Sequence, residues 1–170
     1  EILPLEIKLL NGEQEAETIY SGVAHTCKSN FEQKRLVIDI GGASTELIIG
    51  QGFTANKAIS LNLGCVSFRE KYFTDGQLNE ENFIAAINAA SRIVKPFGIG
   101  FIEFGWQSVV GSSGTIRALA EILTSRQQKI IITAGFLEEI KQTLIKFKTI
   151  DAIAFEGLRA DRSPVLASGL

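Results

Sequence analysis

The residues best suited to chemistry form one short run, Asp39-Ile-Gly41-Gly42-Ala43-Ser44-Thr45-Glu46, at the end of an apolar stretch. Small residues let successive backbone N–H groups turn toward one anion, and the Ser44 and Thr45 hydroxyls add donors. Asp39 and Glu46 flank the turn, where carboxylates bridge Mg²⁺ to phosphate oxygens. The run predicts a phosphate loop of Gly41, Gly42, Ala43, Ser44 and Thr45, with Asp39 and Glu46 as metal ligands. A hairpin that needs its glycines only for tight turning fits the local pattern equally well.

A second cluster, Gly111-Ser112-Ser113-Gly114-Thr115, lies between a predicted strand and a predicted helix. Free amides at a helix start carry the positive end of the dipole and bind anions. Taken alone, the cluster is explained by a cap of small residues. Two such loops in one chain favour a phosphate-bearing ligand at the carboxyl ends of the strands, with Gly111, Ser112, Ser113 and Gly114 as further phosphate ligands.

Two other patterns carry less weight. Gly50-x-Gly52-x-x-Ala55 matches the dinucleotide fingerprint, but a strand and not a helix is predicted after it, so we interpret it as a hairpin turn. Glu13, Glu15 and Glu17 stand at a predicted helix start, where acids ordinarily compensate the dipole. Only proximity to the phosphate loop would make one of them a general base.

The elements that must position these residues follow from periodicity and caps. We expect an extended opening at about 2–10, a helix from Asn11 to about Ala24, a polar loop at 28–34, strands at 35–39, 45–49 and about 55–63, helices at 65–72, 79–94 and 116–123, a strand at 108–110, and a helix capped by Thr133. Pro96 and Gly98 are expected to end the helix at 79–94. Its apolar face must pack on another part of the structure, and consists of Phe83, Ile87, Ala90 and Val94. The order predicts one α/β domain over residues 1–170, in which an antiparallel three-stranded meander feeds into parallel crossovers. The tail after Gly157 resembles an approach to further structure.

Composition excludes several classes of function. The 17 Lys+Arg and 19 Asp+Glu give a net charge of −2 with no basic run, which argues against a nucleic-acid surface. No apolar run reaches the ~20 residues of a membrane span, and no signal peptide is visible, so we expect a cytoplasmic protein with no membrane partner. Cys27 and Cys65 lack a zinc or disulfide spacing and are expected to be free buried thiols, and His25 to be a polar helix-end residue. The absence of methionine suggests a processed piece.

Several blocks together resemble the exopolyphosphatase and guanosine pentaphosphate phosphohydrolase family. They occur in order along nearly the whole chain: Asn11-Gly-Glu-Gln-Glu15-Ala16, Gly22-Val-Ala-His-Thr26, Val37 to Leu47, Gly64-Cys-Val-Ser-Phe68, Gly105-Trp106 and Gly111 to Ile116. The family belongs to the actin, sugar kinase and Hsp70 superfamily, with two ribonuclease-H-like lobes around a cleft. The resemblance implies that this chain is the second lobe, with helices on both faces of its sheet, and that an N-terminal lobe of the same protein is missing.

The resemblance also implies roles. Glu15 matches the glutamate that activates the attacking water, Asp39 and Glu46 match the acids that hold the divalent ion, and Gly41 to Ser44 match the second phosphate loop. The implied reaction is Mg²⁺-dependent hydrolysis of a terminal phosphoanhydride in a phosphorylated small molecule or in polyphosphate. Ala43 and Val23-Ala-His-Thr26 look like the pentaphosphate branch, although one Cβ at position 43 discriminates weakly between substrates. The fragment alone is not expected to be an efficient enzyme.

Other interpretations stay open. An exopolyphosphatase is the close alternative to the pentaphosphate enzyme. A non-catalytic phosphate or nucleotide sensor on the same fold is a rival of another class, and a related sugar or acetate kinase is a third. The sequence leaves the oligomeric state undecided, with a homodimer among the partners considered.

Overall fold

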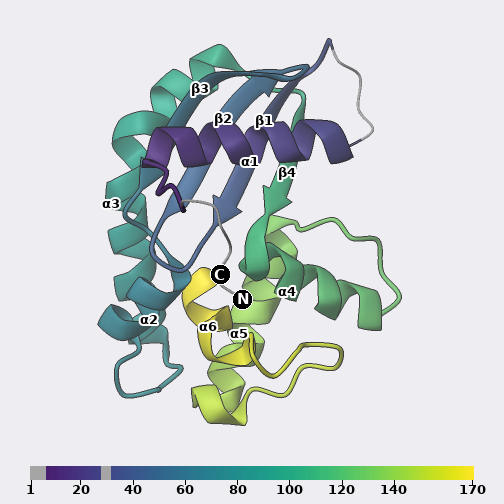
Figure 1. Cartoon of the computed structure of the whole chain (residues 1–170). Helices are drawn as coiled ribbons and strands as arrows, with labels where there is room; N and C mark the ends of the chain where they lie inside the picture. The colour runs from purple at the N-terminus through teal and green to yellow at the C-terminus, as the bar shows by residue number, and fades with distance from the viewer. Residues whose placement is uncertain (1–6, 28–31) are drawn as a thin grey trace.

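A computed structural model describes residues 7–27 and 32–170 as one layered α/β arrangement (Figure 1). The elements in chain order are α1 (Gly12–Thr26), β1 (Lys34–Ile40), β2 (Thr45–Gln51), β3 (Thr54–Leu61), α2 (Cys65–Tyr72), α3 (Glu80–Phe104), β4 (Ser108–Ser112), α4 (Ser113–Ser125), α5 (Ala134–Phe147), the 3-10 turn η1 (Ile150–Ala152) and α6 (Ser163–Gly169). This confirms the predicted α/β class and most of the predicted elements.

The sheet has the strand order β3-β2-β1-β4. β1 pairs with β2 and β2 with β3 in antiparallel fashion, whereas β4 runs parallel to β1. The meander and one parallel crossover are therefore as predicted. The interpretation of Gly50 and Gly52 as a hairpin turn is also confirmed, because Gly52 has a φ of 56° between β2 and β3. In this topology the first glycine cluster lies at the end of β1, and the second spans the end of β4 and the start of α4.

Helices cover both faces of the sheet, as the resemblance implies (Figure 1). On one face α1 buries Ala16 and Tyr20 against Val37 of β1 and Ile48 of β2. On the opposite face Phe101 of α3 packs with strand residues that include Leu36 and Ile49. The helices below the sheet pack around a separate hydrophobic core. Its buried residues include Phe68, Phe73, Leu78, Phe83, Leu119, Ile122, Phe136, Ile140, Leu144 and Leu166.

The start of α1 is encoded locally. The Asn11 side chain accepts a hydrogen bond from the backbone N–H of Gln14 at 2.9 Å, and the Gln14 side chain accepts one from the Asn11 N–H at 3.1 Å. This reciprocal pair is a capping box, which satisfies two amides that the helix leaves free.

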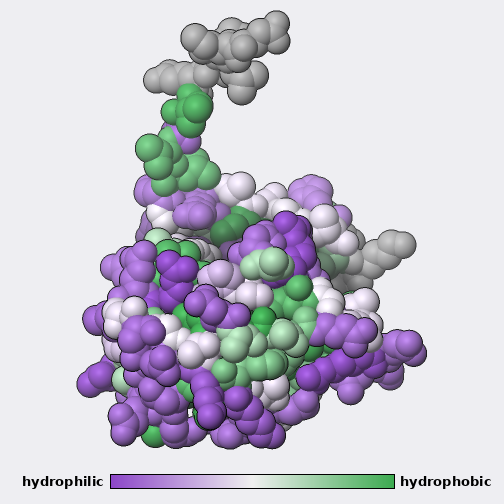
Figure 2. Space-filling view, turned by 90° about the horizontal axis from the view of Figure 1, so that it is seen from below, coloured by the Kyte–Doolittle hydropathy of each residue, from purple (hydrophilic) through white to green (hydrophobic). Residues whose placement is uncertain are grey.

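Two predicted segments lie partly outside the described residues. These are residues 1–6 of the extended opening predicted at 2–10 and residues 28–31 of the polar loop predicted at 28–34. Residues 7–10 form no strand, and the segment stands clear of the body (Figure 2).

The prediction that Pro96 and Gly98 end the third helix is wrong, since α3 continues to Phe104. Pro96 has no backbone N–H, so the carbonyl of Arg92, four residues earlier, loses its helical hydrogen bond. Arg92 is exposed, so water can bind that carbonyl instead. Continuation carries Phe101, which is 5% exposed, onto the sheet. Burial of an aromatic ring is worth about 1.5–3 kcal/mol, which is enough to offset much of the proline cost.

The tail after Gly157 contains a helix that the sequence did not predict. Helix α6 packs against α2, and its Leu166 is 1% exposed in the helical core. That the tail leads to further structure stays a prediction. Helix α4 also begins at Ser113, three residues earlier than predicted. Both cysteines are free, as predicted; Cys65 is buried and Cys27 only partly so. In the described part, no helix has the length and apolar character required to cross a bilayer.

Candidate functional site

Two carboxylates face each other at the loop end of the sheet. Asp39 of β1 is the register partner of Glu46 of β2, so their side chains lie on the same face of the sheet. That face is the one covered by α1, because Val37 and Ile48, two positions away, pack against α1. Ser112 of β4 pairs with Asp39 on its other side. The structure therefore brings together the two acids that the sequence predicts as metal ligands.

Glu46 is 1% exposed, and its Oε1 accepts a hydrogen bond from the Ser60 hydroxyl at 2.7 Å. Asp39 is half-buried, and no described side chain or amide donates to its carboxylate. A buried carboxylate held by a single hydroxyl is costly unless a cation or further donors compensate it. The donor set is all oxygen and doubly acidic, which fits Mg²⁺. Within 7–27 and 32–170, no group of three or more His, Cys, Asp or Glu gathers, so water and phosphate oxygens must complete such a site.

The loop from Gly41 to Ser44 is held by its carbonyls. The Gly41 oxygen accepts from the Cys65 N–H at 2.9 Å, and the Gly42 oxygen accepts from the N–H groups of Val66 and Ser67 at 2.8 and 3.1 Å. These bonds satisfy the amides at the start of α2, whose N-cap Gly64 offers no side chain.

The same bonds aim the loop amides outward. In a trans peptide the N–H points opposite to the preceding C=O, so the Gly42 and Ala43 N–H groups point away from α2. Both residues are exposed, and neither amide donates to an acceptor in the described part of the chain. No residue from Gly41 to Ser44 has a positive φ, so the turn accepts the Cβ of Ala43 without strain. Two adjacent free amides are the arrangement that binds a phosphate oxygen.

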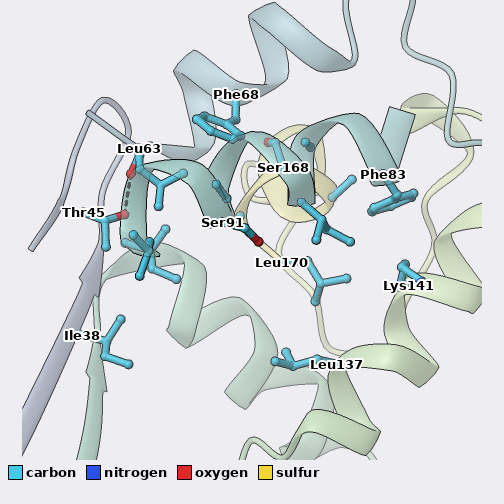
Figure 3. A pocket seen from close by; sticks show the side chains of 18 of the residues that line it. Ile38, Thr45, Leu63, Phe68, Phe83, Ser91, Leu137, Lys141, Ser168 and Leu170 are labelled. Carbon is cyan, nitrogen blue, oxygen red and sulfur yellow. Dashed lines mark hydrogen bonds between the residues drawn. The ribbon is translucent and has the colours of Figure 1, made fainter. Parts of the chain in front are cut away.

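Thr45 is placed differently from the other predicted phosphate ligands. It is 4% exposed and its hydroxyl donates to the Leu63 carbonyl (Figure 3). As the neighbour of Glu46 in a strand, it projects to the opposite face of the sheet. Its hydroxyl anchors the loop and is not directed to the carboxylate face.

The second glycine cluster docks on the end of β1. The Ser113 hydroxyl donates to the Ile40 carbonyl at 2.7 Å, and Thr115 donates to the same oxygen at 3.2 Å. Ser113 holds a φ of 85°, a left-handed conformation that costs a non-glycine residue about 1 kcal/mol or more. The N-cap Ser112 makes no side-chain cap, so the first amides of α4 remain available. The two predicted phosphate loops are thus adjacent.

A cavity of about 140 Å³ lies between the two loops. Gly41 and Gly42 line it from one loop, and Gly114 and Thr115 from the other. Arg162, from the segment before α6, adds a cation to its wall while Nη1 donates to Glu121 Oε1 at 2.6 Å. Sequence reasoning missed Arg162 and Ser60, because both are brought in by tertiary packing with no local motif.

Glu15 lies on the first turn of α1 and is exposed. Gly12, three residues earlier, packs so closely on Ser60 that a Cβ would lie 2.7 Å from the Ser60 Cβ. Since Ser60 binds Glu46, the start of α1 stands over the carboxylate row. His25, by contrast, is a helix-end residue that bonds the Ser21 carbonyl and contacts the Phe53 ring, with centroids 4.7 Å apart.

The chain is similar to known proteins in sequence and in fold. Guanosine-5'-triphosphate,3'-diphosphate pyrophosphatases of Photobacterium profundum and Vibrio parahaemolyticus are each 44% identical over all 170 residues, which span 34% of their length. A Ppx/GppA family member from Aquifex aeolicus superposes with a TM-score of 0.80 at 24% identity, over 99% of this chain and 55% of that one. An exopolyphosphatase from Cytophaga hutchinsonii gives 0.79 at 21% identity, over 96% and 55%. The model of the Ppx/GppA phosphatase family matches residues 1–170, and the chain belongs to that family.

Proposed function

We propose that the protein containing this chain hydrolyses a terminal phosphoanhydride, and that its preferred substrate is guanosine pentaphosphate, which it converts to guanosine tetraphosphate and phosphate. The observation that carries the proposal is the convergence of two glycine loops and the Asp39–Glu46 pair at one end of one sheet. Relatives at 42–44% identity carry the name of that activity. We place the reaction in the cytoplasm as part of the same proposal.

The binding step uses the loop backbone. The outward amides of Gly42 and Ala43 and the uncapped start of α4 would donate to oxygens of the terminal phosphate. Ser44 and Ser112 carry further hydroxyls in these loops, whereas the Ser113 hydroxyl already donates to the Ile40 carbonyl. Fixed donors of this kind stabilise the charge that develops on phosphoryl oxygens without reorganising during the reaction.

Asp39 and Glu46 would hold Mg²⁺, which supplies neutralising charge to the phosphate oxygens when bound. Ser60 keeps the Glu46 carboxylate in position through its 2.7 Å hydrogen bond. Glu15 would take a proton from the attacking water, whose oxygen forms a bond to the terminal phosphorus. The bond from that phosphorus to the bridging oxygen breaks, and the shortened nucleotide leaves. The exposed position of Glu15 suits a base that meets substrate from the cleft side.

Exopolyphosphatase activity is the second candidate. Its support is that the two loops offer backbone amides and serine hydroxyls, which suit phosphate oxygens and have no particular fit to a base or a sugar. A comparison of kcat/KM for guanosine pentaphosphate and long-chain polyphosphate with the intact protein decides between the substrates. A higher value for polyphosphate overturns the preference proposed here.

The sensor interpretation is tested in the full-length protein by Glu15→Gln, with Glu17→Gln as the control on the same exposed helix. For a hydrolase with Glu15 as base, Glu15→Gln lowers kcat by about 10²–10⁴-fold while substrate binding is retained. The control keeps the wild-type rate. If Glu15→Gln is as active as the control, Glu15 is not the general base. If neither the variants nor the wild-type protein hydrolyses either substrate, the proposed hydrolase function is overturned in favour of the sensor interpretation.

A further inference from the structure

The two acids belong to a row of four side chains that crosses the whole sheet. On the face covered by α1, the register partners are Ser112 of β4, Asp39 of β1, Glu46 of β2 and Ser60 of β3 (Figure 1). A serine therefore flanks the acid pair on each side, but the two serines behave differently. Ser60 Oγ donates to Oε1 of Glu46 at 2.7 Å, whereas no hydrogen bond between described residues joins Ser112 to Asp39. Of the two acids, Glu46 is thus the one whose carboxylate is held.

The Ser60 hydroxyl has little freedom to turn elsewhere. Gly12, the first residue of α1, packs against it so closely that a Cβ at position 12 would lie 2.7 Å from Ser60 Cβ and 3.0 Å from its Oγ. Among the described residues, the Glu46 carboxylate is the acceptor of this hydroxyl. Glu46 itself is 1% exposed, so packing also restrains its carboxylate. The start of α1 and the end of β3 together fix which oxygen of Glu46 is engaged inside the protein.

The second oxygen of Glu46, Oε2, is left open. None of the described residues donates a hydrogen bond to it. It is nevertheless not sealed from solvent, in contrast to Nε and Nη1 of Arg35, which are buried without a partner. A buried carboxylate is costly unless both of its oxygens are compensated. Glu46 therefore presents a single oxygen that is both accessible and in need of a partner.

Mg²⁺ and Ca²⁺ differ in what they require of a carboxylate. Mg²⁺ demands near-octahedral geometry at about 2.0–2.1 Å, whereas Ca²⁺ accepts roughly six to eight oxygens at about 2.3–2.6 Å and readily takes both oxygens of one carboxylate. For Glu46 to bind an ion through both oxygens, its carboxylate has to turn away from Ser60, which breaks a hydrogen bond to a charged group. Binding through Oε2 alone leaves that bond intact.

We propose that Ser60 determines which divalent ion the site accepts: by holding Oε1 it makes Glu46 a ligand with one oxygen, and so favours Mg²⁺ over Ca²⁺. The inference rests on the metal-binding role proposed above for Asp39 and Glu46, and extends it from the presence of an ion to the choice of ion. Ser60 is a positioning residue, because it acts through Glu46.

The test measures metal binding by the full-length protein after treatment with EDTA and desalting. MgCl₂ or CaCl₂ alone is titrated into the wild type, Ser60→Ala and Thr54→Ala, and the Kd of each ion is obtained by calorimetry and from the rise in Tm. Thr54→Ala is the control, since it removes an exposed hydroxyl from the same strand. In Ser60→Ala the ratio of the Kd for Ca²⁺ to the Kd for Mg²⁺ should fall by about tenfold, roughly the worth of one hydrogen bond to a charged group. Thr54→Ala should keep the wild-type ratio.

An unchanged ratio in Ser60→Ala overturns the inference, even where both ions bind more weakly, because the hydroxyl then supports the carboxylate without selecting an ion. The melting temperature in EDTA checks that the variant is folded. Should it not fold, Ser60→Cys replaces the hydroxyl with a weakly donating thiol and should shift the ratio in the same direction; an unchanged ratio there counts equally against Ser60.

Failure of the proposed metal site gives a different result. In that case the wild type shows no Mg²⁺ titration, or Glu46→Gln titrates as the wild type does. Either outcome removes Glu46 from the metal site and overturns the role of Ser60 with it. A wild-type titration that requires Glu46, combined with a lowered ratio in Ser60→Ala, supports both the site and its selectivity.

Discussion

Gly64 lies directly against the peptide of Gly42. A Cβ at position 64 would sit 2.3 Å from the Gly42 carbonyl oxygen and 2.4 Å from its carbon. That same oxygen accepts hydrogen bonds from the N–H groups of Val66 and Ser67 in the first turn of α2, so the contact holds the predicted phosphate loop in place. The loop geometry therefore depends on a residue 22 positions away that has no polar side chain.

Gly64→Ala should displace this loop. The methyl group meets rigid backbone and not a flexible side chain, so we expect a loss of about 1–3 kcal/mol in the free energy of unfolding, together with weaker phosphate binding. The control is Gly98→Ala in α3, where nothing lies within 4 Å and alanine should stabilise the helix by up to about 1 kcal/mol. Urea denaturation of both variants measures the difference, and equal effects would contradict the contact.

Ser113 combines a strained backbone with a useful hydroxyl, and two substitutions separate these effects. Ser113→Ala keeps the left-handed φ of 85° and loses the bond to Ile40, so it should cost about 1 kcal/mol. Ser113→Gly loses the same bond but relieves the strain, so it should be more stable than the alanine variant by about 1 kcal/mol. Denaturant midpoints compare the two. Identical midpoints would show that the backbone at 113 is relaxed.

Mg²⁺ should stabilise the protein through the carboxylate pair. With EDTA present, Glu46→Gln should be at least as stable as the wild type, because it removes a buried charge for which, among the described residues, the Ser60 hydroxyl is the hydrogen-bond donor. With Mg²⁺ in excess, the wild type should gain melting temperature and the variant should not, since a ligand stabilises only the state that binds it. Asp39→Asn should likewise lose the metal titration. Wild-type titration in either variant removes that residue from the metal site.

The Tyr20 phenol should lose its proton at a higher pH than an ordinary tyrosine does. Burial between α1 and the sheet raises the pKa of its phenol, an effect that the nearby charge of Arg35 partly opposes. A raised folded pKa means that the contribution to stability is complete below about pH 10, the ordinary tyrosine value, and is lost as pH rises through the folded pKa. The chain has two tyrosines, so Tyr72→Phe leaves Tyr20 as the single phenol. Its absorbance midpoint should lie above 10, and a midpoint at or below 10 would contradict the burial effect.

Arg35 presents a related test. It is 5% exposed, and its Nε and Nη1 have no acceptor among the described residues. A buried guanidinium with two nitrogens that lack an acceptor among the described residues is unfavourable, so Arg35→Met, which keeps an apolar side chain of similar length, should leave stability unchanged or raise it by about 1 kcal/mol. The same variant should raise the pKa of Tyr20 further, because the opposing charge is gone. A large loss of stability would show that the guanidinium has a partner.

Local signals were sufficient for most of the fold. The Asn11 cap, the apolar strands on either side of Gly41-Gly42 and the Thr133 cap are each decided within a few residues, and the structure confirms them. The path of α3 through Pro96 was not predictable, because the gain comes from Phe101 packing on a sheet assembled from distant segments.

The site was predictable as a list of residues but not as a geometry. The adjacency of the two loops follows from the parallel pairing of β1 with β4, which the order of elements suggests. The face of Thr45, the place of Arg162 in the cavity wall and the support of Glu46 by Ser60 depend on register and tertiary packing. Short motifs carry no information about those relationships. The roles of Glu15, Asp39 and Glu46 and of the phosphate-binding residues, like the extent of the domain, remain predictions.

The carbonyls of Ile40, Gly41 and Gly42 all accept hydrogen bonds from α4 or α2, so the hairpin presents the N–H groups of Gly42 and Ala43 outward, and the two carboxylates lie in the neighbouring row. This end of the sheet therefore presents hydrogen-bond donors at the hairpin and negative charge beside it. For a ligand that carries a phosphate and a divalent cation, this arrangement favours the orientation with the anionic end at the hairpin tip and the cation toward Asp39. The fold thereby sets the orientation of such a ligand before any side chain has to read the rest of it.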